Sequence, residues 1–125
     1  MRSLAGFLAL AGALLFAETD PQWPVLKHVP PAARVKSNHL LKNPDSPAVG
    51  RKLFEQHCTA CHGKAGEGSR RAPALSNEEM RHATPGDIYW ILTNGMVREG
   101  MPSWSQLPEP QRWQLVAFIS AMNVQ

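Results

Sequence analysis

The chain has 125 residues, 43% of them hydrophobic and 18% charged, and a formal net charge of +3. This length suits one small domain. The modest charge, without a long basic run, argues against nucleic acid as a partner.

Residues 1–17 have the composition of a secretory signal peptide. Arg2 precedes thirteen uncharged residues from Leu4 to Phe16, and Ala17 offers a small residue at the expected cleavage site. As a helix this run would rise only about 20 Å, less than the hydrocarbon core of about 30 Å. We therefore expect export to the periplasm or the outer face of the membrane. An uncleaved signal that tethers the chain to the membrane is the alternative.

Residues 18–45 form a proline-rich segment. Six of the eleven prolines fall between Pro21 and Pro47, and neither a helical nor a strand period is sustained. Proline interrupts helices and removes backbone donors. The segment is therefore predicted to be an extended N-terminal arm.

Apolar residues within this arm argue against a purely disordered segment. They are Trp23, Val25, Leu26, Leu40 and Leu41. We expect at least the half of the arm nearer Ser46 to lie on the following domain, with Leu40 or Leu41 as its anchor. The histidines His28 and His39 are expected to be solvated.

Residues 46–125 are predicted to form the folded domain, beginning with a helix. Ser46 suits the N-cap and Pro47 the first helical position. Apolar and ring side chains follow at helical spacings, at Val49, Leu53, Phe54 and His57. Gly50 costs this helix about 1 kcal/mol relative to alanine, and close approach of another helix would explain it.

The first helix runs into Cys58-Thr59-Ala60-Cys61-His62, the attachment pattern of a c-type haem. Residues i and i+3 of one helical turn share a face, so both thiols can reach the vinyl groups of one porphyrin. His62, at i+4 from Cys58, can present a ring nitrogen to the iron. The pattern predicts one haem c, attached covalently through Cys58 and Cys61.

Other uses of the two cysteines fit less well. A zinc site would need a second pair of ligands, and the chain has no further cysteine. A thioredoxin-type redox pair would need a strand–helix–strand setting. A structural disulfide would not need His62.

Three further helices are predicted, over residues 76–82, 84–95 and 109–122. Ser76 and Glu79 have the spacing of a capping box at the start of the first of these. Glycines and charged residues between positions 63 and 74 indicate a surface loop. Because strand alternation is absent, we predict an all-α fold of about four short helices around the haem.

A second axial ligand is expected among the methionines and the four other histidines. The methionine candidates are Met80, Met96, Met101 and Met122. Met101 is favoured because it lies in a loop between Gly100 and Pro102, where a thioether can be aimed across the ring. Met96, which directly follows Gly95, is the serious competitor.

The segment from Gly50 to the C-terminus, about three fifths of the chain, resembles a class I monohaem cytochrome c of the exported bacterial type. The order and spacing of its motifs carry the resemblance. These are Gly50 and Phe54, Cys58 to Gly63, Ala72 to Leu75, Asn94-Gly95, Met101 to Trp104, and Trp113 to Ile119.

The resemblance implies a haem clamped between His62 and Met101. It also implies that Pro73 offers its carbonyl to the other nitrogen of His62. Residues expected to contact the cofactor, besides the two cysteines, are Pro73, Leu75 and Trp104. A crossing of the first and last helices of the domain is implied at Gly50, Phe54, Leu115 and Phe118.

The leading hypothesis for function is a one-electron carrier, monomeric when free, that exchanges electrons with redox proteins and catalyses nothing itself. The alternative is a haem c subunit, or a tethered electron-entry domain, of a membrane-bound oxidase, reductase or dehydrogenase. A haem with an open distal site, acting as a peroxidase or gas sensor, is a third hypothesis that Met101 argues against. Lys64, Arg70 and Arg71, with Arg81 as a further candidate, are either a docking surface for acidic partners or ordinary solvated charges.

Overall fold

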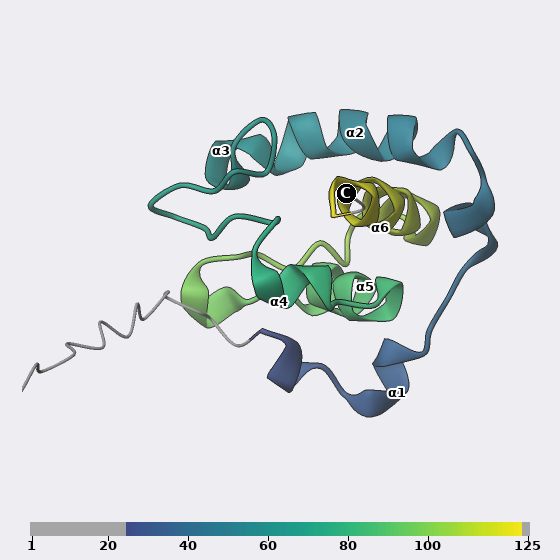
Figure 1. Ribbon diagram of the computed structural model, residues 1–125, viewed down its shortest axis with the longest axis horizontal. Coiled ribbons are helices and arrows are strands. Elements are labelled where there is room, and N and C mark those ends of the chain that lie inside the picture. The colour runs from purple at the N-terminus through teal and green to yellow at the C-terminus, as the bar shows by residue number, and fades with distance from the viewer. Residues whose placement is uncertain (1–24, 124–125) are drawn as a thin grey trace, which may run out of the picture.

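In the computed structural model, the two longest helices cross face to face and supply most of the core. They are α2 (Ser46–His57) and α6 (Glu109–Met122). Figure 1 shows α2 lying across α6, with α5 (Pro85–Asn94) on the other side of α6. The core is therefore formed where α6 packs between two other helices.

The structure describes residues 25–123, so the predicted signal peptide lies outside the described residues. Short helices complete the described part: η1 (Leu26–His28), α1 (Pro31–Arg34), η2 (His39–Lys42), α3 (Thr59–His62), α4 (Glu78–Arg81) and η3 (Val97–Glu99). Over this range the chain forms one isolated antiparallel bridge and no strand, which confirms the predicted all-α fold. None of the helices between residues 25 and 123 has the length and apolar character needed to cross a membrane.

Two predicted helix caps differ from those in the structure. Ser46 is itself the first helical residue and is buried, while Asp45 stands at the cap position without a side-chain hydrogen bond. The helix α4 is capped by Asn77, whose side chain accepts from the Met80 amide over 2.8 Å. Glu79 takes no part in a capping box, because its carboxylate accepts a hydrogen bond from the backbone of the arm instead.

The crossing of α2 and α6 is close at Gly50. A Cβ added to Gly50 would lie 2.0 Å from the Gln114 carbonyl oxygen and 2.8 Å from the Phe118 Cβ. One turn further along, the rings of Phe54 and Phe118 pack with their centroids 5.3 Å apart. Leu115, buried in the same cluster, completes the contact. The implied crossing of the first and last helices is thus confirmed, and it accounts for a glycine inside a helix.

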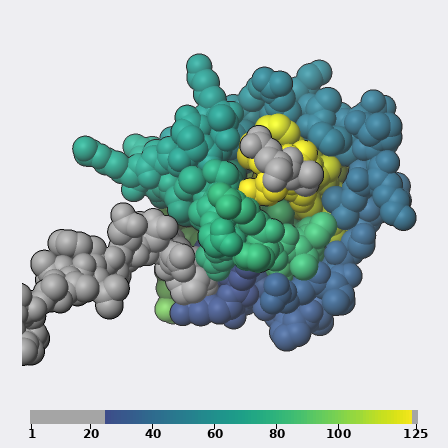
Figure 2. All heavy atoms as spheres, in the orientation of Figure 1, coloured from purple at the N-terminus to yellow at the C-terminus, as the bar shows by residue number. Residues whose placement is uncertain are grey.

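The arm passes around the domain and stays in contact with it (Figure 1). Leu40 and Leu41 in η2 pack against the main core, as expected. Val29 and Ala33 are buried as well, so the docked part of the arm reaches beyond the half nearer Ser46, which was expected as a minimum. Figure 2 shows the arm residues covering one edge of the surface. Between residues 25 and 45, the arm contains three short helical turns that the sequence did not predict, and His28 and His39 are exposed, as expected.

Replacing Gly50 with alanine tests this crossing, because the close approach of the helices determines whether the free energy of unfolding rises or falls. Helix propensity alone would raise the free energy of unfolding by about 1 kcal/mol. The contact with the Gln114 carbonyl should instead lower it by about 1–3 kcal/mol through overpacking. Denaturant unfolding of the cofactor-loaded protein measures the difference. Gln56→Ala, at an exposed position of α2, is the control, and a gain in stability for Gly50→Ala would contradict the close crossing.

Candidate functional site

The Cys58–His62 segment forms one tight helical turn at the end of α2. Cys58 is at once the last residue of the hydrogen-bonded α2 ladder and the start of α3. Its amide donates to the Phe54 carbonyl over 2.9 Å, and its carbonyl accepts from the amides of Cys61 and His62 over 3.3 and 2.9 Å. The local fold therefore presents both thiols and the imidazole within a single turn, as the sequence predicted.

The two thiols differ in exposure and are not joined in a disulfide. Cys58 is 9% exposed within the main core, and Cys61 is half-buried. Burial, with a smaller contribution from nearby Cys61, raises the pKa of the Cys58 thiol to about 11. A thiol used for disulfide exchange needs a lowered pKa, so this environment does not favour a redox pair.

His62 is half-buried, and burial lowers the pKa of its imidazole. The ring is therefore neutral near pH 7, the form that can donate a lone pair to a metal. The Pro73 backbone, acting as a hydrogen-bonding partner, opposes this shift without overcoming it. However, the buried Nδ1 atom of His62 makes no hydrogen bond within the described residues. Pro73 is thus near the ring, but a well-formed hydrogen bond between them is not made.

A glycine-containing loop returns the chain from His62 to Leu75. The Gly68 amide donates to the His62 carbonyl over 2.8 Å, and the Ser69 hydroxyl donates to the Cys61 carbonyl over 2.6 Å. The Leu75 amide donates to the Gly66 carbonyl over 2.8 Å. These bonds satisfy carbonyls at the open end of α3 and fix Leu75 against the main core.

The segment that carries Met101 is tied to the end of α5. The Trp104 amide donates to the Leu92 carbonyl over 2.8 Å, and the Ser103 hydroxyl donates to the Thr93 carbonyl over 2.6 Å. Within the segment, the amide of Met96 donates to the Met101 carbonyl over 3.0 Å, and the reverse bond is 3.1 Å. This antiparallel pair holds the Met101 backbone in place, while the left-handed Gly100 closes the turn.

The four candidate methionines lie in different surroundings. Met80 and Met122 pack against the main core, and Met96 packs against a second, smaller cluster formed by Val29, Ala33 and Ile91. Among the apolar residues of the described range, Met101 alone packs against both clusters. It is half-buried, as a side chain that reaches a cofactor would be.

Most of the side chains expected to contact the cofactor lie on one core. Cys58 belongs to the main cluster, and Leu75, Met101 and Trp104 are partly exposed side chains packed against it. The Trp104 ring also packs against the His57 ring in a tilted arrangement, with centroids 5.1 Å apart. The structure thus brings the attachment turn and the Met101 segment to the same apolar surface.

These features fit a haem. Between residues 25 and 123, no three His, Cys, Asp or Glu side chains converge on a point where they could hold a single metal ion. A flat, apolar macrocycle needs a different arrangement, with two thiols on one turn, a neutral imidazole and a partly exposed apolar surface. Cys58, Cys61 and His62 provide the first two, and the apolar residues on the main core provide the third.

Sequence reasoning missed the polar residues that fasten the arm to the helices beside this site. They are Arg34, Glu79, Thr84 and Asp87. One signal was present, because the capping-box pattern of Thr84 and Asp87 leaves one carboxylate oxygen of Asp87 without a local partner. The sequence did not indicate which cation would approach that oxygen.

Comparison with known proteins supports this geometry. The family model described as cytochrome c oxidase, cbb3-type, subunit III matches residues 45–119, well over half of the chain. The predicted resemblance to a monohaem cytochrome c is therefore confirmed at the level of the family.

The chain is also similar to longer curated proteins named cbb3-type cytochrome c oxidase subunit CcoP. The protein of Azospirillum brasilense is 31% identical over 115 residues, which cover 78% of this chain and 39% of that protein. The protein of Rubrivivax gelatinosus is 32% identical over 79 residues, covering 62% of this chain and 26% of the relative. The chain thus spans about a quarter to two fifths of the length of these two relatives.

The attachment turn and the Met101 segment both lie within the residues that the family model matches. The chain belongs to the cytochrome c family described as cytochrome c oxidase, cbb3-type, subunit III.

Proposed function

We propose that this chain is a haem c electron-transfer domain that works with a membrane-bound oxidase of the cbb3 type. The single observation that carries the proposal is the Cys58–His62 turn, held against the same core as Met101. The relatives named as oxidase subunits supply the class of partner. The proposal thus prefers the alternative of the sequence analysis over its leading hypothesis of a freely diffusing carrier.

Haem c, when bound, supplies a reversible one-electron couple at its iron. The chain's own residues attach and orient the group. Cys58 and Cys61 would form thioether bonds from adjacent positions on one turn. His62, neutral because it is buried, would be the first axial ligand, with Pro73 close enough to help orient its ring.

The second axial ligand is proposed to be Met101. The support is its position against both clusters and the backbone pairing that holds it. Met96, the competing candidate, packs against the cluster of Val29, Ala33 and Ile91 but not against the main core. A thioether ligand raises the reduction potential relative to a second nitrogen, and axial ligand identity can change potentials over about 0.8 V.

With both axial positions filled, the iron would have no site for substrate, which opposes the peroxidase and gas-sensor hypotheses.

A basic surface near the attachment turn supports docking on an acidic partner. Lys64, Arg70 and Arg71 are exposed and take part in no ion pair within residues 25–123. Arg81, by contrast, pairs with Glu78 over 3.3 Å. Clustered unpaired charge of this kind speeds association with an oppositely charged protein at low ionic strength.

Covalent attachment is tested by removing the thiols. The chain has two cysteines, so the double variant Cys58→Ser/Cys61→Ser should release its haem under denaturing conditions, whereas the parent keeps it. Mass spectrometry of the denatured protein distinguishes the two, and each single variant should retain the haem through one bond. Complete loss of haem from the denatured parent would contradict the attachment.

Ligation by Met101 is tested with Met101→Ala. The variant should keep its haem, lose the thioether-to-iron charge-transfer band of the oxidised protein, show a lower reduction potential and bind carbon monoxide in the ferrous state. Met80→Ala removes the same side chain from a position on the main core and should leave the band intact. If Met101→Ala retains the parental band and potential, the ligand is another residue and Met96 is the next candidate.

The oxidase assignment is tested in the native host. Affinity purification of the tagged chain from detergent-solubilised membranes should recover oxygen-reducing activity together with covalent haem. The triple variant Lys64→Glu/Arg70→Glu/Arg71→Glu should slow electron transfer to that oxidase at low salt and lose the difference at high salt. Recovery of the tagged chain only from the soluble fraction, without oxidase activity, would favour the diffusing carrier.

A further inference from the structure

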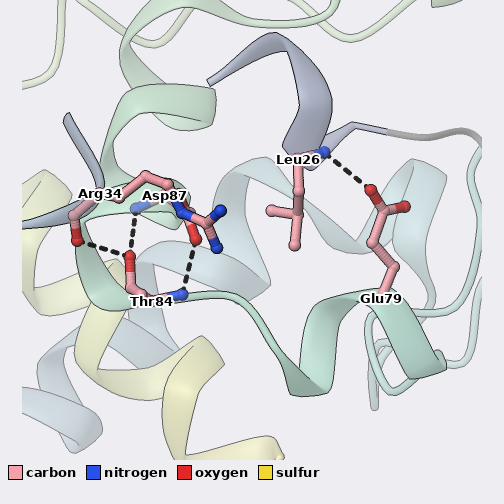
Figure 3. Close-up of polar contacts among 5 residues, drawn as sticks. All are labelled: Leu26, Arg34, Glu79, Thr84 and Asp87. Carbon is pink, nitrogen blue, oxygen red and sulfur yellow. Dashed lines mark hydrogen bonds and ion pairs between the residues drawn. The ribbon is translucent and has the colours of Figure 1, made fainter. Parts of the chain in front are cut away.

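The N-terminal arm is fastened to the helices beside Met101 at both ends of residues 26–34. At the first end, the Leu26 amide donates to the Glu79 carboxylate over 2.7 Å. At the other end, the Thr84 hydroxyl donates to the Arg34 carbonyl over 2.7 Å. Figure 3 shows these contacts bridging the arm and the two segments that follow each other in sequence, α4 and the start of α5.

An ion pair strengthens the second attachment. The Arg34 Nε lies 3.2 Å from Asp87 Oδ1, and the Asp87 side chain is completely buried. The two groups are close without forming a well-aligned hydrogen bond, so their attraction is mainly ionic. The other Asp87 oxygen accepts from the Thr84 amide over 2.8 Å. A buried carboxylate held in this way needs its cationic partner, which makes the arm part of the folded domain.

Gly86 allows the arm to come into backbone contact with α5. A Cβ added to Gly86 would lie 2.1 Å from the Ala33 carbonyl oxygen. Any larger residue at position 86 would push α1 away from the first turn of α5. The close approach therefore depends on a glycine in α5 as well as on the residues of the arm.

Behind these polar contacts, the arm builds the apolar cluster on which the Met101 segment rests. Val29 is 5% exposed and Ala33 is 6% exposed, and both pack with Ile91 of α5. Met96 and Met101, the two residues of the antiparallel bridge, pack against this cluster. The arm thus lies on one side of the segment that carries the proposed iron ligand.

The Met101 segment has little other support on that side. The bridge consists of two hydrogen bonds, and the residues between its ends form only the short η3, where Val97 is 70% exposed. Segments with few buried apolar contacts open locally at low free-energy cost. Packing from the arm therefore matters more here than it would in the middle of α6.

We propose that the arm positions Met101: by packing Val29 and Ala33 against Ile91 and the Met96–Met101 bridge, it keeps the thioether directed at the iron. The inference rests on the proposed function only in taking Met101 as the axial ligand. Val29 and Ala33 are then positioning residues, which act through Met101 without touching the iron. Undocking the arm would shift the domain toward a form in which Met101 leaves the iron more often.

The test compares lysine substitutions at Val29 and Val35, which are six residues apart on the same arm. Val29→Lys places a charge in the buried cluster, while Val35→Lys makes the same chemical change at a residue that is 82% exposed. In the full-length holoprotein, Val29→Lys should weaken the thioether-to-iron band, lower the potential and speed carbon monoxide binding by about tenfold or more. Val35→Lys should match the parent in all three.

Hydrogen exchange supplies a readout that does not involve the iron. The amides of Met96 and Met101 should exchange faster in Val29→Lys, while the amides of Cys58 and His62, which bond within the attachment turn, should not. Leu41→Ala, which weakens the arm on the main core, controls for general loss of stability. Leu41→Ala should keep the thioether-to-iron band even if its unfolding midpoint falls as far as that of Val29→Lys.

If Val29→Lys does not give a folded holoprotein, Val29→Ala takes its place, with the same readouts and the same control. Parental band, potential and amide exchange in the Val29 variant would overturn the inference. Should Met101→Ala abolish the band while the Val29 variant keeps it, the ligand assignment stands and the positioning role is wrong. Should Met101→Ala keep the band, the ligand assignment itself fails, and the positioning role falls with it.

Discussion

The candidate site depends on the close crossing of α2 and α6 at Gly50. Because no side chain separates the α2 backbone from the Gln114 carbonyl, the helices approach until Phe54 and Phe118 pack ring on ring. Cys58 follows Phe54 by one turn and is bonded to its carbonyl. The distance between the helices therefore fixes the place where the attachment turn begins. Spreading the helices would move both cysteines relative to every residue on the other side of the core.

Local patterns in the sequence were sufficient to predict the longer helices of the domain, although not the short helical turns of the arm. The predicted helices at residues 84–95 and 109–122 correspond to α5 and α6 within one residue at each end. Helical periodicity depends on neighbours in sequence, which explains this agreement. The caps at Ser46 and Glu79 were wrong because tertiary contacts compete for the same groups. Ser46 is drawn into the interior, and Glu79 accepts a bond from a residue 53 positions away.

The docking of the arm could be predicted only in part. Leu40 and Leu41 were expected to be anchors because exposed leucines in a short segment are unfavourable. Burial of Val29 and Ala33 could not be inferred, since it depends on the missing side chain of Gly86 and the buried charge of Asp87. Gly86 and Asp87 each have an ordinary local role at the start of α5. Their second role exists only once the arm has folded back across α5.

The two halves of the candidate site are therefore supported in different ways. His62 belongs to a helical turn that continues α2, and loop hydrogen bonds satisfy the carbonyls at the end of that turn. Met101 belongs to a short bridged segment whose packing is shared between the main core and the arm.

Electron transfer favours a site whose geometry is the same in both oxidation states, so both halves must be held before the electron arrives. The histidine half is held by the main fold of the domain, whereas the Met101 segment also packs on Val29 and Ala33, which lie outside residues 45–119. In this chain, the packing around Met101 therefore extends beyond the residues that the family model matches.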